Sequence, residues 1–504
     1  MASRKGTSVW TRLLIPDAGM MVAAVSLFFG LFLGDGPSKL FRDSDTGWHI
    51  RNGERLLDGH PLARTDPYSF TKPGQPWFAW EWGADAIMGA AHRSNGLPGV
   101  ALLYAALSAS CVWLWFRLHW MAGGNFFLAC VMASPLLTTL QLHYLARPHV
   151  FGWLCSLTAL SLMEGRGRRF GVWQAVGFGL FGAVWANLHA SFFFLPGIAV
   201  LYAVSALVRR FLWDEPAWWQ WYALAAVCSL AGTFVNPYGW GLHAHVLAYL
   251  SNSELLARIG EFQSFNFHAE GSLPILIAVL LALCGAVLAL EARRPEHFLL
   301  LLGLTALALR SARALPLLAL LALPLANGAI TAALERAGVR SALRRKLDAF
   351  LAYSERLRML ESRCGGYAVA PLVLLLAFVI LKAPAMAAQA GFPAKEFPVA
   401  AAAAVDALPA NAKLLAPDKF GGYLIYRFDG RRKVFFDGRS DFYGVAFMKD
   451  YIRLIEARPG WRRQVEEFGF DSALLPNNYT LVDGLRQLGW QQVYRDDTAT
   501  LLRK

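Results

Sequence analysis

The sequence predicts an α-helical polytopic membrane protein with about eleven transmembrane helices and a small C-terminal α/β soluble domain. Hydrophobic residues make up 56% of the 504 positions and charged residues only 16%, which is too apolar for a soluble protein. Apolar segments long enough to cross about 30 Å of hydrocarbon recur from residue 14 to residue 389. We therefore expect a transmembrane domain over 1–390 and a soluble domain over 391–504.

The expected spans follow from apolar length first and from the positions of basic loops second. They are 14–34, 97–117, 124–141, 148–164, 171–187, 190–208, 217–235, 273–290, 297–310, 314–331 and 366–387. The first two spans enclose a long loop over 35–96, which we expect on the periplasmic side.

The basic residues set the expected orientation. Every second connection carries Lys and Arg, most strongly the segment 335–363, and positive loops stay in the cytoplasm. The expected location is a bacterial inner membrane crossed many times, with the N-terminus in the cytoplasm and the C-terminal domain in the periplasm. The net charge of +13 is spread over these loops, so it indicates contact with membrane lipids and no nucleic-acid partner.

The C-terminal domain shows short alternating or apolar runs typical of strands, separated by segments with helical spacing. The expected strands are 422–428, 433–437, 473–476 and one or more within 491–502. The expected helices are 397–408, 447–457, 460–468 and 481–488.

Ionisable and polar residues near membrane depth gather on one side of this topology. Charged groups are costly there, so they are functional candidates by default. The first outer loop carries Asp43, Asp45, His49, Glu54, Asp66 and Glu81, and the outer ends of later spans carry His143, Arg147, His149, Asn187, His189, Asn236, Arg310 and Arg313. Carboxylates beside arginines and imidazoles at one membrane surface suit a reaction with a lipid-linked phosphate. The alternative is purely structural pairing, which does not require the histidines and asparagines.

Three motifs each allow a functional and a structural interpretation. Asp43 and Asp45 form an Asp-X-Asp motif that can chelate a divalent cation such as Mg or Mn, although a lone motif of this kind is common by chance. Trp77, Trp80 and Trp82 can form a sugar platform, but their depth favours interfacial anchors. The segment 437–441, Asp-Gly-Arg-Ser-Asp, can bind a ligand, but Asp-Gly after a strand favours a turn.

Several segments carry a resemblance to a known superfamily. They are Asp45-Thr46-Gly47-Trp48-His49, Thr65-Asp66-Pro67-Tyr68-Ser69-Phe70, Asn236-Pro237-Tyr238-Gly239-Trp240, Gly421-Gly422-Tyr423-Leu424 and Phe436-Asp437-Gly438-Arg439. With the long acidic first loop, about eleven spans and an outer C-terminal domain, the chain resembles the C-type membrane glycosyltransferases. That superfamily includes oligosaccharyltransferase catalytic subunits, protein O-mannosyltransferases and aminoarabinose transferases. The sequences of these motifs are most similar to those of a group of bacterial membrane proteins with the same general architecture.

The resemblance implies transfer of a sugar from a polyprenyl-phosphate-linked donor to a glycan, lipid or protein acceptor on the outer face. The superfamily's catalytic carboxylate maps to Asp43 or Asp45, and we expect Asp45 to act as general base with Asp43 or Glu81 in support. Topology assigns the donor phosphate to Arg147, His149, His189, Arg310 and Arg313, and adds His49, Asp66, Asn187 and Asn236 to the site. The C-terminal domain lacks a Trp-Trp-Asp motif, which argues against glycosylation of peptide Asn.

Two other classes of function remain open at this point. A transporter or flippase of a lipid-linked glycan also needs arginines for phosphate, but transporters usually contain paired halves, which this sequence does not show. A non-catalytic membrane assembly protein would use the outer domain to bind a partner.

Overall fold

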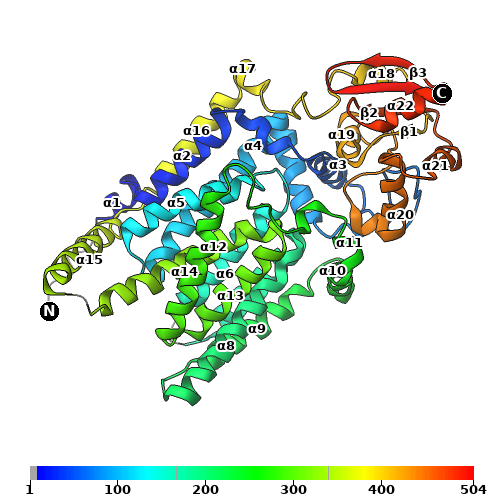
Figure 1. The fold of residues 1–504 in the computed structure, drawn as a ribbon. Coiled ribbons are helices and arrows are strands. Elements are labelled where there is room, and N and C mark those ends of the chain that lie inside the picture. The colour runs from blue at the N-terminus through cyan, green and yellow to red at the C-terminus, as the bar shows by residue number, and fades with distance from the viewer. Residues whose placement is uncertain (1–7, 166–168, 339) are drawn as a thin grey trace.

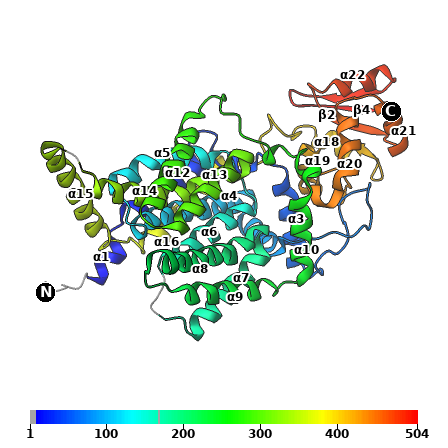
Figure 2. The same ribbon diagram turned by 60° about the horizontal axis from the view of Figure 1, so that its bottom comes forward.

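A computed structural model describes residues 8–165, 169–338 and 340–504. A bundle of helices carries a small domain with a β-sheet at one end, and helices α1 (Val9–Leu14) and α15 (Ser341–Glu361) lie at the opposite end (Figure 1). Figure 2 shows the same separation after rotation. Position 339, within the predicted basic connection 335–363, lies outside the described residues.

A helix occupies each of the predicted spans. These helices are α2 (Ala18–Phe32), α4 (Trp82–Met121), α5 (Phe126–Gln141), α6 (His149–Glu164), α7 (Val172–Leu188), α8 (Phe194–Trp213), α9 (Trp219–Thr233), α12 (Leu273–Glu291), α13 (Pro295–Arg310), α14 (Leu315–Arg336) and α16 (Val369–Leu381). Within the described part of the chain, five helical segments are long and apolar enough to cross a membrane, namely Val9–Phe32, Trp82–Met121, Ala190–Trp213, Leu273–Glu291 and Ala312–Arg336. The chain is therefore a helical membrane protein.

The predicted first loop, 35–96, contains more helix than expected. It includes the 3-10 helix η1 (Gly36–Phe41) and helix α3 (Asp45–Leu57), and α4 already begins at Trp82, with a backbone break at Asn95 and Gly96. Helices α3 and α4 approach closely because Gly53 faces the other backbone, where an added Cβ would lie 1.7 Å from the Asp85 carbonyl oxygen. This contact fixes α3 against the end of the bundle.

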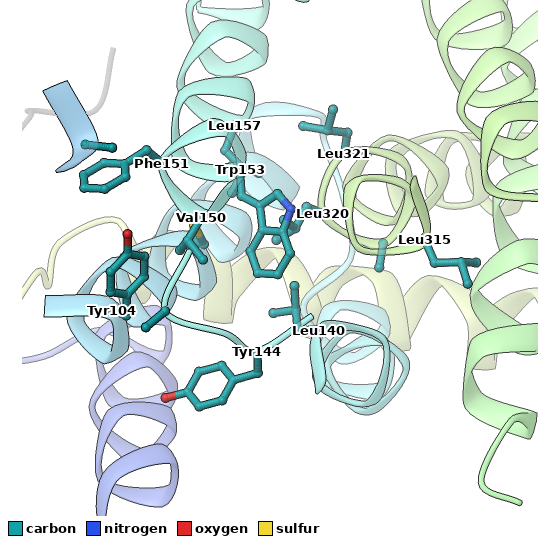
Figure 3. Close-up of a cluster of buried hydrophobic side chains, with 14 of the residues drawn as sticks. Tyr104, Leu140, Tyr144, Val150, Phe151, Trp153, Leu157, Leu315, Leu320 and Leu321 are labelled. Atoms are coloured by element: carbon teal, nitrogen blue, oxygen red, sulfur yellow. The ribbon is translucent and has the colours of Figure 1, made fainter. Parts of the chain in front are cut away.

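Large apolar side chains join α4, α6 and α14 in the interior of the bundle. Figure 3 shows Tyr104, Phe151, Trp153 and Leu320 among them, and all four are buried. Lipid is as apolar as these side chains, so close packing and satisfied polar groups, rather than the hydrophobic effect, hold such helices together.

The C-terminal domain contains a four-stranded sheet in the order β1 (Leu414–Leu415), β2 (Ser472–Pro476), β4 (Ala499–Arg503) and β3 (Gln491–Arg495). Strand β1 pairs with β2 in parallel, and the other two pairs are antiparallel. Helices α18 (Ala402–Asp406), α19 (Asp418–Arg427), α20 (Ser440–Ile455), α21 (Trp461–Phe468) and α22 (Thr480–Gln487) complete it. The strands predicted at 473–476 and within 491–502 are confirmed.

Two predicted strands of this domain are wrong. Residues 422–428 belong mostly to helix α19, and 433–437 contribute only an isolated bridge between Ser69 and Val434. The glycine pair at 421 and 422 explains the first error, because it serves a close helix contact rather than a strand. A Cβ added at Gly422 would lie 2.2 Å from the Ser44 carbonyl oxygen, and one at Gly47 would lie 2.1 Å from the Gly422 carbonyl oxygen.

The loop that follows α2 is hydrogen-bonded to the C-terminal domain. The Val434 amide donates to the Tyr68 carbonyl at 2.9 Å, and the Phe70 amide donates to the Val434 carbonyl at 3.1 Å. The Thr71 hydroxyl adds a bond of 2.9 Å to the Phe435 carbonyl. The first loop and the C-terminal domain therefore form one continuous surface that faces the end of the helical bundle.

Candidate functional site

A cavity of about 1290 Å³ lies between the helical bundle, the first loop and the C-terminal domain. Its apolar part includes Leu304, Leu307 and Leu317 from α13 and α14. Its polar part includes Asp43, Asp45, Glu81, Arg147, His189, Glu261, Arg310, Arg313, Asp418, Lys419, Asp437, Arg439, Ser440 and Asp441. One concave site with an apolar side and convergent polar groups is the usual form of a ligand pocket.

Seven of the residues predicted for the site line this cavity together. They are Asp43, Asp45, Glu81, Arg147, His189, Arg310 and Arg313, which come from five separate segments of the chain. His49 lies just beneath the lining, where only 1% of its side chain is exposed.

Arg147 is the centre of a carboxylate cluster in the cavity wall. Its Nη1 donates to Asp43 Oδ2 at 2.8 Å and to Glu261 Oε1 at 2.7 Å, while its Nη2 lies 2.9 Å from Asp45 Oδ2. Asp45 starts helix α3, and its amide donates to Asp43 Oδ1 at 2.9 Å. The Thr46 hydroxyl bonds the Ala146 carbonyl at 2.9 Å, which ties the start of α3 to the segment that carries Arg147.

The C-terminal domain touches Asp45 directly. A Cβ added at Gly438 would lie 2.0 Å from Asp45 Oδ1, so only glycine fits at this position without moving the carboxylate. Asp437 and Arg439 on either side are buried and paired, with Arg439 Nε and Nη2 donating to Asp437 at 2.8 and 2.7 Å. The absence of a side chain at Gly438 therefore leaves the space that the Asp45 carboxylate occupies.

Burial and neighbouring charges shift the acidic groups in opposite directions. Burial raises the pKa of Asp45, although Arg147 opposes the rise. Burial also raises the pKa of Glu81 to about 7, with His49 opposing it. Burial acts in the same sense on Glu261, but Arg147 and Arg313 outweigh it and hold the pKa of this carboxyl well below its ordinary value. Two carboxyls of the wall thus have pKa values suited to proton transfer near neutral pH.

Glu81 lies between two imidazoles. Its carboxylate oxygens are 3.9 Å from His49 Nε2 and 3.6 Å from His189 Nε2. On its far side, His49 Nδ1 lies 2.6 Å from Asp85 Oδ1, and Asn52 donates to the other Asp85 oxygen at 2.5 Å. Burial lowers the pKa of His49 to about 3, and the neighbouring Glu81 carboxylate opposes this shift.

Arg310 and Arg313 stand at the bundle side of the cavity, at the end of α13 and just after it. Arg313 Nη1 lies 3.3 Å from Glu261 Oε2, and the Arg313 guanidinium also lies over the ring of Phe262. Arg310 is exposed, and no carboxylate among the described residues forms an ion pair with it. Arg310 and Arg313 are therefore the accessible cations on the bundle side of the cavity.

The remaining predicted residues serve local structure. His149 Nε2 donates to the His143 carbonyl at 2.9 Å, and Asn187 accepts from the Trp82 indole at 2.7 Å. Asn236 accepts from the Tyr238 amide at 2.8 Å within its own turn, and Asp66 lies 2.9 Å from Arg439 Nη2. None of the four lines the cavity.

Sequence reasoning missed two parts of the wall. Glu261 belongs to no recognisable motif. Only its position in the connection between the predicted spans 217–235 and 273–290 could have identified it as a candidate. The segment 437–441 was interpreted as a turn, and the backbone does bend at Gly438, but the segment also lines the cavity. Trp77 is not an interfacial anchor, because it is buried beneath Arg439 with 4.8 Å between the guanidinium carbon and the ring centroid.

The predicted divalent-cation site at Asp43 and Asp45 does not fit this arrangement. Both carboxylates already bind the guanidinium of Arg147, so a metal ion would have to displace it. Within the described part of the chain, no group of three or more His, Cys, Asp or Glu side chains is arranged to hold a metal ion.

Comparisons with known proteins bear on the fold. No protein-family model and no curated protein sequence matches the chain. Its structure is similar to that of the oligosaccharyltransferase of Archaeoglobus fulgidus in the apo form, with a TM-score of 0.57 and 12% identity over 91% of this chain and 69% of the other. ArnT from Cupriavidus metallidurans bound to undecaprenyl phosphate aligns with a TM-score of 0.49 and 15% identity over 96% of this chain and 97% of that one.

The likeness to the oligosaccharyltransferase extends over nearly the whole chain. At this level of identity it concerns the fold and not the substrate. The chain therefore shares the fold of this oligosaccharyltransferase.

Proposed function

We propose that this protein transfers a sugar from a polyprenyl-phosphate-linked donor to an acceptor. The observation that carries the proposal is one cavity that joins apolar helix surface, two accessible arginines and buried carboxylates. Arginine forks suit a phosphate, and the apolar side suits the first isoprene units of a lipid. The fold shared with an oligosaccharyltransferase supports the same class of reaction.

The proposed step uses groups that already face the cavity. Asp45 accepts the proton of an acceptor hydroxyl or amine, whose oxygen or nitrogen forms the new bond to the anomeric carbon of the sugar. The bond from that carbon to the phosphate oxygen breaks, and the departing polyprenyl phosphate keeps the electron pair. Arg310 and Arg313 stabilise the charge that develops on the phosphate. Asp43 and Glu81 support Asp45 in this proposal.

The proposed orientation follows the basic loops, with α15 in the cytoplasm and the cavity in the periplasm of a bacterial cell. A cysteine placed at Gln75, an exposed residue of the first loop, should then react with a membrane-impermeant reagent in whole cells, and one placed at the exposed Arg345 on α15 should not. Reaction at Arg345 alone in whole cells would reverse the orientation.

The direct test of the function is binding of polyprenyl monophosphate to the purified protein in lipid nanodiscs. Replacing Arg310 or Arg313 by Gln should weaken binding about tenfold each, because a charge-assisted hydrogen bond contributes about 1.5–3 kcal/mol. Arg345→Gln is the matched control, since it removes the same charge from the other end of the molecule.

Equal binding by the wild type and by the double variant Arg310→Gln/Arg313→Gln would contradict the proposed phosphate site. Binding that persists while no sugar is transferred from any polyprenyl-phosphate donor would favour a transporter or flippase. Absence of binding by the wild type would favour a membrane assembly protein.

A further inference from the structure

Three acidic residues from two separate parts of the chain converge on one guanidinium. Asp43 and Asp45 come from the start of the first outer loop, and Glu261 comes from the 3-10 helix η3 (Gly260–Phe262). Their oxygens lie 2.7–2.9 Å from the two terminal nitrogens of Arg147. Only 17% of the Arg147 side chain is exposed, so water replaces few of these contacts.

The three carboxylates offer the type of ligand that a hard divalent cation prefers, but around Arg147 they are not placed closely enough together to hold one. Carboxylate oxygens are the ligands that Mg²⁺ and Mn²⁺ prefer, and three negative charges in a partly buried wall need compensation. Arg147 supplies one positive charge at the centre, and Arg313 supplies a second at 3.3 Å from Glu261. The space between the three carboxylates is filled by the side chain of Arg147 itself.

We propose that Arg147 is the resident cation of this carboxylate cluster and that the protein binds no divalent cation there. Asp43 and Asp45 are thus ligands of an arginine rather than of Mg or Mn. A guanidinium is permanently charged and remains attached to the chain, so the cluster keeps its shape without a supply of metal ions.

The same geometry changes the role of Arg147. Three of its five N–H groups already donate to carboxylates, so we assign the donor phosphate to Arg310 and Arg313 instead. Arg147 is instead a positioning residue that holds Asp45 against Gly438. The positioning role of Arg147 rests on the proposed function. The proposal that Arg147 takes the place of a divalent cation rests only on its contacts with the three carboxylates.

The test is a titration of the full-length protein in nanodiscs with Mn²⁺, followed by electron paramagnetic resonance of the free ion. The wild type should show no saturable site. Arg147→Ala should create one site per protein, with an affinity at least tenfold above background, because the carboxylates lose their cation. The site should disappear again in Arg147→Ala/Glu261→Gln.

Arg51→Ala is the matched control. Arg51 is similarly buried, with 19% of its side chain exposed, and pairs with Glu54 and Asp429, but it has no third carboxylate. Its removal should create no Mn²⁺ site, which excludes a general effect of losing an ion-paired arginine.

A stoichiometric Mn²⁺ site in the wild type that is lost in Asp45→Asn would overturn the inference, even if Arg147→Ala does not fold. A well-folded Arg147→Ala protein without any gain in Mn²⁺ binding would overturn it as well. Because neither measurement uses a sugar donor, failure here is separate from failure of the proposed glycosyl transfer.

Discussion

Replacing Asp45 by Asn is expected to lower the rate of sugar transfer by about a thousandfold, in line with the loss of a general base. Asn keeps the size of the side chain next to Gly438 and Arg147, but it cannot accept the proton of the acceptor. Binding of polyprenyl monophosphate should change less than threefold, since Arg310 and Arg313 remain. The measurement compares transfer from a panel of polyprenyl-phosphate-linked sugars with lipid binding by the same preparation.

Asp58→Asn serves as control for the Asp45 experiment. Asp58 lies at the other end of α3, is exposed and forms an ion pair with Arg93 outside the cavity. Its replacement should leave transfer within a factor of two. An Asp45→Asn protein that folds, binds the lipid and transfers sugar at the wild-type rate would remove Asp45 from the mechanism and favour Glu81 as the base.

Replacing Asp437 by Ala should destabilise the C-terminal domain by about 3 kcal/mol, the scale observed when one partner of a buried ion pair is removed. Arg439 is only 3% exposed and makes two hydrogen bonds to Asp437, so Asp66 would remain its single carboxylate partner. The first loop and the domain meet at this pair, so their junction should open first. Thermal unfolding and the rate of thermolysin cleavage between 65 and 77 report this directly.

Asp483→Ala is the control for the stability experiment, because Asp483 is exposed and forms a surface pair with Arg486. Such a pair contributes about 0–1 kcal/mol, so the domain should stay intact. If Asp437→Ala has the same unfolding temperature and the same thermolysin cleavage rate as Asp483→Ala, the buried pair does not hold the loop to the domain. Loss of sugar transfer without loss of stability would instead assign Asp437 to the cavity chemistry.

The sequence located the helices of the bundle because apolar length is a local property. Each predicted span contains a helix, although the ends shift and α4 begins well before the predicted residue 97. The extra helical part, 82–94, was interpreted as loop because Asp85, His92 and Arg93 make it polar. Those side chains pair with α3 and its flanks, and partners across the fold are invisible in a window of sequence.

The sequence also pointed to seven residues that share one cavity, because their one-sided distribution follows from topology alone. It did not distinguish these from His149, Asn187 and Asn236, which satisfy nearby backbone or indole groups at the same end of the bundle. Depth in the membrane is shared by both sets. Only the direction of each side chain separates them, and direction depends on how the helices pack.

What the sequence by itself determined is the class of molecule, a helical membrane protein with polar groups at one end, and the resemblance carried by Asp45 and its neighbours. The tertiary structure alone decided that Gly438 lies against Asp45, that Glu261 joins the cluster and that Arg147 binds the two aspartates at which a metal ion was expected. The physical reason is distance along the chain. The length of an apolar segment and the sequence of a motif are properties of neighbouring residues. These contacts instead join residues more than a hundred positions apart, and only the folded chain brings them together.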